Sequence, residues 1–342
     1  MQFSAILTPF TALACLVLVP TWSAAQTQTA GRTPDPISAQ AAGVILDMSQ
    51  AYKKGDSKRL SALLPQARGH VLEPWAAYWE LRSRLDTASK SEIEAFLSRY
   101  AGSYQEDRLR NDWLLMLGQR RDWATFAAEH PNYRMSDDRE VKCYALTVGH
   151  GPAGADLPVD IKRLWYAQRE ADDGCAYAAA QMHDASRLSD TEVWVKARLA
   201  MEANRPRLAR QALEMIGREA VTPLNDIQDN PARYLAKHKP APSGAQHTLS
   251  QEWAVLALVR LAASDADAAA EALQGKLAKQ LTTEQRSWAW GAIGKSAAQR
   301  LSSDAMRYYA QARDTDLSDD QLAWKVRAAL RKGDWKQVQT AI

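Results

Sequence analysis

The stretch Asn111–Pro131, NDWLLMLGQRRDWATFAAEHP, predicts two helices joined by a short polar turn. Apolar residues from Leu109 to Leu117 recur at intervals close to the 3.6-residue period of an α-helix. Gly118 follows them and is expected to end the first helix, as a glycine after the last turn often does. The second helix is expected to begin near Trp123 and to stop at the proline that closes the stretch. Since neither helix can bury its apolar stripe alone, the pair needs neighbouring helices.

The C-terminal stretch Gln321–Ile342, QLAWKVRAALRKGDWKQVQTAI, repeats this arrangement. A first helix carries Trp324, Arg331–Gly333 form the turn, and Asp334 and Trp335 open a second helix. Both units place a tryptophan directly after a tight basic turn, GQRRDW and LRKGDW. The repetition predicts stacked antiparallel helix pairs, an α-solenoid. The alternative is an ordinary α-helical protein that has two similar turns.

The composition favours an all-α fold. The chain has 342 residues, of which 46% are hydrophobic and 24% charged, enough for a large core or about two domains. Only 16 glycines and 14 prolines are present, and alanine is plentiful, which favours helices over strands and turns. The net charge of +3 is too small and too scattered for a nucleic-acid-binding protein. The 12 tryptophans are expected mainly to fill core, although indole also stacks on sugar rings.

Residues 1–25 have the pattern of a secretory signal peptide. Ala5–Val19 is an uncharged apolar run, and Ser23–Ala25 supplies small residues at the expected cleavage point near Ala25. No lysine or arginine precedes the run, so either the amino terminus supplies the charge or the start codon lies upstream. A transmembrane anchor is the alternative, but the run is short. We therefore expect export without stable membrane insertion. Lipidation at Cys15 is disfavoured because the third position before it is Ala12 where leucine is expected, and apolar residues continue after it.

The rest of the chain divides by composition. Residues 26–35 form a polar leader, 36–216 carry successive helical patterns, and 217–247 hold several prolines and glycines typical of short helices and a linker. Residues 248–342 continue the helical repeats. Because the last pattern stops at Ile342 without a capping residue, we expect the chain to be part of a longer polypeptide, truncated at the C-terminus.

Local signals mark several helix starts. Ser89–Glu92 and Ser189–Glu192 match the capping box, in which a serine and a glutamate satisfy each other's backbone N–H groups. The carboxylate doublets Asp137–Asp138, Asp172–Asp173 and Asp319–Asp320 all precede apolar helical runs. Acidic residues are favoured there as caps and by the helix dipole, so these doublets are not expected to act in acid–base catalysis.

Cys143 and Cys175 are the two cysteines that remain after cleavage of the signal peptide. In an exported protein such a pair most simply forms a disulfide, which would lower the unfolded-state entropy by the equivalent of about 3–4 kcal/mol. Two buried free thiols are the alternative. A metal site is disfavoured because no CxxC or HxxxH pattern accompanies them.

No arrangement of residues predicts an active site in this chain. The six histidines are dispersed, and neither the nucleophile elbow GxSxG nor a Walker loop occurs in the sequence. We therefore assign no catalytic residue, no cofactor and no metal to the chain itself.

The order of several segments resembles the soluble lytic murein transglycosylase family. The segments are PWAAYWELRSRL, FLSRYAGSYQEDRLRNDWLLMLGQRRDWATF, the cysteine pair REVKCYAL…DDGCAYAA, and the terminal LRKGDWKQVQTAI. The resemblance rests on the order of these segments, and it covers most of residues 35–342. The family's pattern of a helix-borne cysteine answered by a cysteine at a later helix start falls on Cys143 and Cys175.

This resemblance implies a periplasmic protein whose N-terminal helix pairs form a ring-like superhelix. It also implies cleavage of the bond between N-acetylmuramic acid and N-acetylglucosamine in peptidoglycan, with a 1,6-anhydro product and a single glutamate as general acid and base. The family's Glu-Ser signature is absent from this sequence, so the catalytic glutamate would belong to a missing C-terminal domain. The expected partners are peptidoglycan glycan strands, and other cell-wall enzymes as a further class.

Two readings therefore remain. The chain is either the scaffold region of such an enzyme, inactive alone, or a non-enzymatic periplasmic helical-repeat adaptor that binds proteins. In the first reading four arginines could face the carboxylates of peptide stems, although each could equally lie on a solvated helix face: Arg108, Arg110, Arg120 and Arg121.

Overall fold

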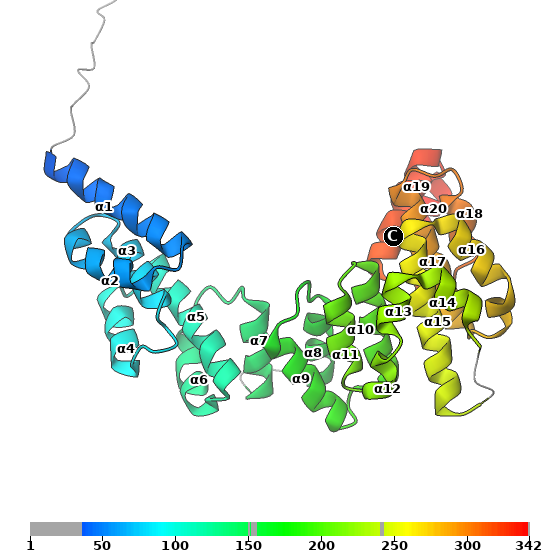
Figure 1. Ribbon diagram of the computed structural model, residues 1–342, viewed down its shortest axis with the longest axis horizontal. Coiled ribbons are helices and arrows are strands. Elements are labelled where there is room, and N and C mark those ends of the chain that lie inside the picture. The colour runs from blue at the N-terminus through cyan, green and yellow to red at the C-terminus, as the bar shows by residue number, and fades with distance from the viewer. Residues whose placement is uncertain (1–35, 150, 152–155, 240–242, 341–342) are drawn as a thin grey trace, which may run out of the picture. The chain divides into compact units, whose positions relative to one another are not determined.

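The computed structural model describes residues 36–149, 151, 156–239 and 243–340, and the side chains from residue 43 onward within these ranges. The predicted signal peptide, residues 1–25, and the leader, 26–35, lie outside the described residues. Within the described ranges every regular element is a helix (Figure 1). The all-α class and the stacking of helix pairs predicted from the sequence are confirmed.

The chain forms two compact units, of which the first ends at Ala76 and the second begins at Ala77. The first contains α1 (Pro36–Lys53), α2 (Ser57–Leu63), the 3₁₀ helix η1 (Leu64–Ala67) and the start of α3 (Glu73–Arg82). The second unit continues with α4 (Lys90–Arg99), α5 (Tyr104–Arg120), α6 (Trp123–Glu129), η2 (His130–Asn132), α7 (Arg139–Thr147), α8 (Leu157–Tyr166), α9 (Asp173–Asp184), α10 (Asp190–Glu202), α11 (Pro206–Leu213), α12 (Arg218–Val221), α13 (Leu224–Asp229), α14 (Pro231–Lys237), α15 (Ala245–Ser264), α16 (Ala266–Gln274), η3 (Lys276–Lys279), α17 (Thr283–Gln299), α18 (Ala305–Tyr309), η4 (Asp314–Asp316), α19 (Asp319–Lys332) and α20 (Trp335–Thr340).

One backbone turn joins the helices of several pairs. Between α5 and α6, Arg121 adopts the left-handed conformation with φ 59°. Its N–H donates to the Gly118 carbonyl, and the N–H of Asp122 donates to the Leu117 carbonyl. These two bonds form a Schellman motif, which satisfies carbonyls at the helix end and reverses the chain. The Asp122 carboxylate then accepts the N–H of Thr125 and caps α6.

The turn between α19 and α20 repeats this geometry. Gly333 has φ 72°, its N–H donates to the Leu330 carbonyl, and the N–H of Asp334 donates to the Ala329 carbonyl. Asp334 accepts the N–H of Gln337, as Asp122 does for Thr125. The short likeness of GQRRDW and LRKGDW is therefore a shared turn. The same pair of bonds recurs at four further left-handed residues: Gly55, Ser186, Asn204 and Leu301.

Gly118 does not end its helix, and this prediction was wrong. Helix α5 continues to Arg120, and Arg121 takes the left-handed position instead. A Cβ atom on Gly118 would lie 2.3 Å from a ring carbon of Tyr144 on α7. The glycine is therefore needed for the close approach of the Tyr144 ring to α5, and its placement near the helix end in the sequence is incidental.

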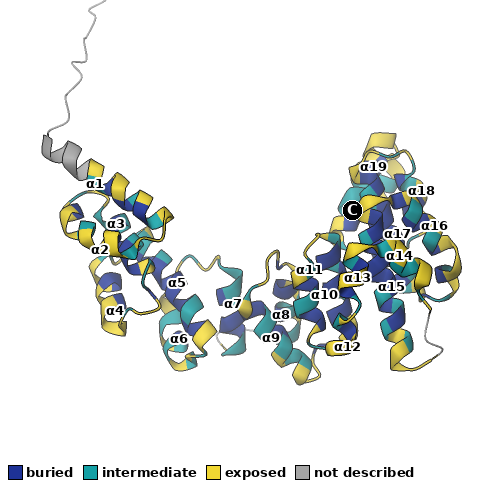
Figure 2. Ribbon diagram, in the orientation of Figure 1, coloured by how far each residue is buried: buried dark blue, intermediate teal, exposed yellow. Residues whose placement is uncertain are grey.

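In the second unit, the first helices of successive pairs pack in a row. Helix α10 contacts α15, α15 contacts α17, and α17 contacts α19. Their pair partners α11, α16, α18 and α20 each pack against the helix that precedes them. Figure 2 shows the buried residues concentrated along α10, α15 and α17, which other helices cover on most sides. Each pair thus covers the apolar face of its neighbour, as expected for a solenoid.

The local signals at helix starts are confirmed. Capping boxes form at Ser89 with Glu92 and at Ser189 with Glu192. Asp138 caps α7 and Asp172 caps α9, while the third doublet lies in the first turn of α19. The carboxylates of Asp138 and Asp172 accept backbone N–H groups, which is the capping role expected for them.

A disulfide joins Cys143 on α7 to Cys175 on α9, with 5.0 Å between their Cα atoms. Both residues are fully buried. This is the pair expected from the sequence, and it fixes two helices that already pack side by side.

Substitution of Gly118 by alanine is expected to lower the free energy of unfolding by about 1–3 kcal/mol, because the new Cβ displaces the Tyr144 ring. Urea denaturation measures the change. Gly43→Ala in α1 is the matched control, since nothing lies within 4 Å of its added Cβ. That variant should gain up to about 1 kcal/mol in helix propensity. If Gly118→Ala is also stabilised, the close contact is not present.

The capping box of α4 predicts a pH-dependent contribution to stability. Hydrogen bonds from the Ser89 backbone and hydroxyl, and the Arg84 guanidinium, lower the pKa of Glu92 to about 2. Because the folded-state pKa lies below the unfolded value, the stabilisation is present above pH 4.5 and is lost as pH falls toward 2. Glu92→Gln should therefore be less stable than the parent at pH 7, and the difference should shrink over that window. Urea titrations at several pH values test this, with Glu94→Gln as the exposed control; a pH-independent difference contradicts it.

Candidate functional site

Residues 217–247, predicted as an irregular linker, contain three short helices and the start of α15. Helices α13 and α14 both pack against α15. Asn230 ends α13 and caps α14, since its side chain accepts the backbone N–H of Arg233 at 2.9 Å. The prolines and glycines that break the helical period here separate these short elements. The domain boundary placed in this segment stays a prediction.

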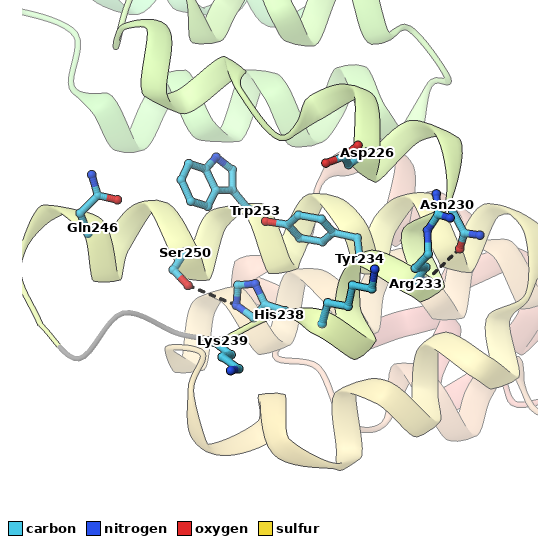
Figure 3. A pocket seen from close by; sticks show the side chains of 10 residues that line it. Asp226, Asn230, Arg233, Tyr234, His238, Lys239, Gln246, Ser250 and Trp253 are labelled. Carbon is cyan, nitrogen blue, oxygen red and sulfur yellow. Dashed lines mark hydrogen bonds between the residues drawn. The ribbon is translucent and has the colours of Figure 1, made fainter.

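A hollow of about 560 Å³ lies between these helices (Figure 3). Helix α13 contributes Asp226, α14 contributes Arg233, Tyr234 and Lys237, and α15 contributes Gln246, Ser250 and Trp253, with Asn230, His238 and Lys239 from the connections. The lining is mostly polar and carries two large aromatic rings. The volume is that of a small-molecule site.

The two aromatic side chains in the lining are Tyr234 and Trp253, and both are partly buried. The Trp253 indole N–H donates to the Ala220 carbonyl at 3.1 Å, which fixes the orientation of its ring. Burial, with a smaller contribution from Asp226, raises the pKa of Tyr234 to about 12. The phenol is therefore neutral at pH 7 and can donate a hydrogen bond.

His238 and Ser250 are in contact in the wall of the hollow. The Nε2 atom of His238 lies 3.2 Å from the Ser250 hydroxyl (Figure 3). Burial lowers the pKa of His238, so the ring is neutral at pH 7. A nucleophilic serine needs a base that a third group orients, and the described residues supply no carboxylate partner to His238. Ser250 is also only 3% exposed. This pair shapes the wall and does not form a catalytic dyad.

The hollow carries an excess of positive charge. Arg233, Lys237 and Lys239 are exposed and line it, against the single carboxylate of Asp226. Among the described residues none of these three cations forms an ion pair. Each can therefore bind an external anion without first breaking an internal contact.

A buried ionic network holds α15 in place on the side that faces α10 and α17. The Arg198 guanidinium on α10 donates to both carboxylate oxygens of Glu252 on α15, at 2.6 and 2.8 Å, and to Glu284 at 2.6 Å. Gln285 donates a further bond of 2.8 Å to Glu252. Glu252 lies between Ser250 and the Trp253 indole in sequence, so the network fixes the helix that presents both to the hollow.

The four arginines considered as ligands for peptide carboxylates bind within the protein instead. Arg110 is buried and bonds to Glu129 at 2.6 Å, and Arg121 stacks on the Tyr177 ring at 3.9 Å. The further partners are Glu106 for Arg110, Asp173 for Arg121, the Asp86 carbonyl for Arg120 and Tyr78 for Arg108. Glu106 lies four residues before Arg110 on α5, a spacing visible in the sequence, but the other partners come from other helices and turns. The cations of the hollow were not predicted, since their segment lacks a helical period.

Across the described ranges no group of three histidine, cysteine or acidic side chains comes close enough to hold a metal ion. None of the described helices combines the length and apolar character needed to cross a bilayer.

Comparisons with known proteins identify the relatives of this architecture. No family model and no curated protein matches the chain. Among solved structures, an inactive mutant of the lytic transglycosylase Slt from Pseudomonas aeruginosa matches 87% of this chain at 25% sequence identity, with a TM-score of 0.51. The chain is similar to the soluble lytic transglycosylases. This confirms the resemblance inferred from the sequence.

Two further lytic transglycosylase structures match with lower scores. The 70-kDa enzyme of Escherichia coli covers 90% of this chain at 17% identity and a TM-score of 0.47. A 70-kDa soluble lytic transglycosylase in complex with bulgecin A covers 89% at 16% identity and a TM-score of 0.45. The chain spans about half the length of the lytic transglycosylases it matches, from 48% to 50%.

Replacement of Arg198 by methionine is expected to destabilise the protein by about 3–5 kcal/mol, because Glu252 then stays buried without its cation. A second change, Glu252→Gln, should recover much of this loss. Arg187→Met, at an exposed position, should alter stability by no more than about 0.5 kcal/mol. Urea denaturation compares the variants. A double variant no more stable than Arg198→Met would contradict the role of the buried charge.

Proposed function

We propose that this chain is the helical, non-catalytic part of a periplasmic soluble lytic transglycosylase. The observation that carries the proposal is the similarity to the Pseudomonas aeruginosa enzyme over 87% of this chain and 48% of that one. The signal-peptide pattern of residues 1–25 and the expected disulfide of Cys143 with Cys175 support export to an oxidising compartment.

In this proposal the whole protein cleaves the bond between N-acetylmuramic acid and N-acetylglucosamine in peptidoglycan. One glutamate protonates the glycosidic oxygen, and the 6-hydroxyl of the muramyl residue attacks to form a 1,6-anhydro product. A single carboxylate suffices because the nucleophile belongs to the substrate. We assign this glutamate to a C-terminal domain outside the 342 residues, since no Glu-Ser signature occurs in this sequence.

The part played by the chain is then to hold glycan strands for that domain. Stacked helix pairs give an extended, rigid surface, which suits a polymer better than a small substrate. Among the described residues, the cations that line the hollow form no internal ion pair that would compete with a bound strand. Other cell-wall enzymes are proposed as further partners of the same surface.

Purified Gln26–Ile342 incubated with intact peptidoglycan sacculi should sediment with the pellet and release no anhydromuropeptides. Mass spectrometry of the supernatant and quantification of pelleted protein measure both outcomes. The same chain centrifuged without sacculi controls for sedimentation of the protein by itself. Anhydro products would contradict the assignment of the catalytic glutamate to another domain. Failure to bind sacculi would favour the protein-binding adaptor and remove the scaffold proposal.

A further inference from the structure

Three exposed cations line the hollow. Several buried cations elsewhere in the second unit are matched by carboxylates, as Arg110 is by Glu129 and Arg198 by Glu252. Arg233, Lys237 and Lys239 converge on one concavity and have no such partner among the described residues. These three like charges repel one another, and no ion pair among the described residues offsets the repulsion. A ligand of opposite charge would offset it.

The remaining lining favours a ring-shaped, hydroxylated ligand over a bare anion. Tyr234 and Trp253 line the hollow and are partly buried, and the C–H face of a pyranose can stack on aromatic rings of this kind. Asn230 and Gln246 add amide groups that can pair with hydroxyl or acetamido groups. Gln246 is held by a 2.8 Å bond from its Nε2 atom to Glu219, so its position is already set.

We propose that this hollow binds a saccharide that bears a carboxylate, with Arg233 and Lys237 on the carboxylate and the two aromatic rings on the sugar. The assignment deepens the proposed function, on which it rests, by naming the part of a glycan strand that the scaffold holds: a sugar ring carrying a lactyl or other acidic substituent. The hollow of about 560 Å³ accommodates one or two pyranose rings.

Three small-molecule probes distinguish binding of the carboxylate by the cations from binding of the sugar by the aromatic rings. N-acetylmuramic acid carries both the pyranose and the carboxylate, N-acetylglucosamine carries the pyranose alone, and D-lactate carries the carboxylate alone. In a ligand-observed NMR titration of the purified chain, N-acetylmuramic acid should bind at least about tenfold more tightly than either of the others. Equal affinity for N-acetylglucosamine would overturn the role of the cations, and equal affinity for D-lactate would overturn the role of the rings.

Variants of exposed residues test the location without threatening the fold. Arg233→Gln with Lys237→Gln should weaken N-acetylmuramic acid binding about tenfold and leave the midpoint of thermal unfolding unchanged. Lys276→Gln with Lys279→Gln removes the same charge from exposed positions outside the lining and is the matched control. That control should keep the parent affinity. Equal weakening in both double variants would show attraction by net charge alone and overturn the site.

Failure of the saccharide site can be distinguished from failure of the scaffold proposal. If the parent chain sediments with sacculi but shows no saturable binding of N-acetylmuramic acid, the hollow is not the glycan contact and the scaffold proposal stands. The opposite result is that N-acetylmuramic acid binds the parent chain and not the double variant, while the parent chain does not sediment with sacculi. In that case the saccharide site stands and the scaffold proposal fails.

Discussion

Two buried charges on α10 set the arrangement of the helices that follow it. Arg198 binds Glu252 on α15 and Glu284 on α17, and Glu202, one turn further on, binds Lys295 on α17 at 3.2 Å. The Glu202 side chain is 5% exposed, and Gln321 on α19 donates a second bond to it at 2.7 Å. An unpaired charge at this depth costs several kcal/mol, so α15, α17 and α19 are each confined to positions that supply a partner. Apolar packing alone tolerates many more relative positions of four helices.

This constraint reaches the hollow through α15. Glu252 faces Arg198, and Ser250 and Trp253, two residues before it and one residue after it in the helix, line the hollow. Fixing the rotation of α15 on its buried side therefore fixes which side chains it presents on the other. The ring of Trp253 is further held by its bond to the Ala220 carbonyl. Because contacts on its buried side already fix α15, the side chains that it presents to the hollow lose little conformational entropy on ligand binding.

Local features could be predicted from the sequence, whereas, apart from the disulfide of Cys143 with Cys175, contacts between distant residues could not. The capping boxes at Ser89 and Ser189 depend on residues three apart, so the pattern is visible in the chain itself. Gly118 was misassigned because its reason, the Tyr144 ring, lies on another helix. The pairing of Arg110 with Glu129 and of Arg121 with Asp173 was hidden in the same way. The hollow was missed because its lining comes from three helices and two connections in a segment without a clear period.

The hollow exists where the regular pairing of long helices is interrupted. Helix α15 has 20 residues, whereas α13 and α14, which cover its flank, have 6 and 7. At a rise of about 1.5 Å per residue, α15 is about 30 Å long and each short helix only about 10 Å. The two short helices therefore leave part of the flank uncovered, and side chains from both sides meet there around open space. A solenoid of uniform pairs would close this gap with apolar contacts. Here the interruption is lined by cations, amides and two aromatic rings, the composition of a site for a polar anionic ligand.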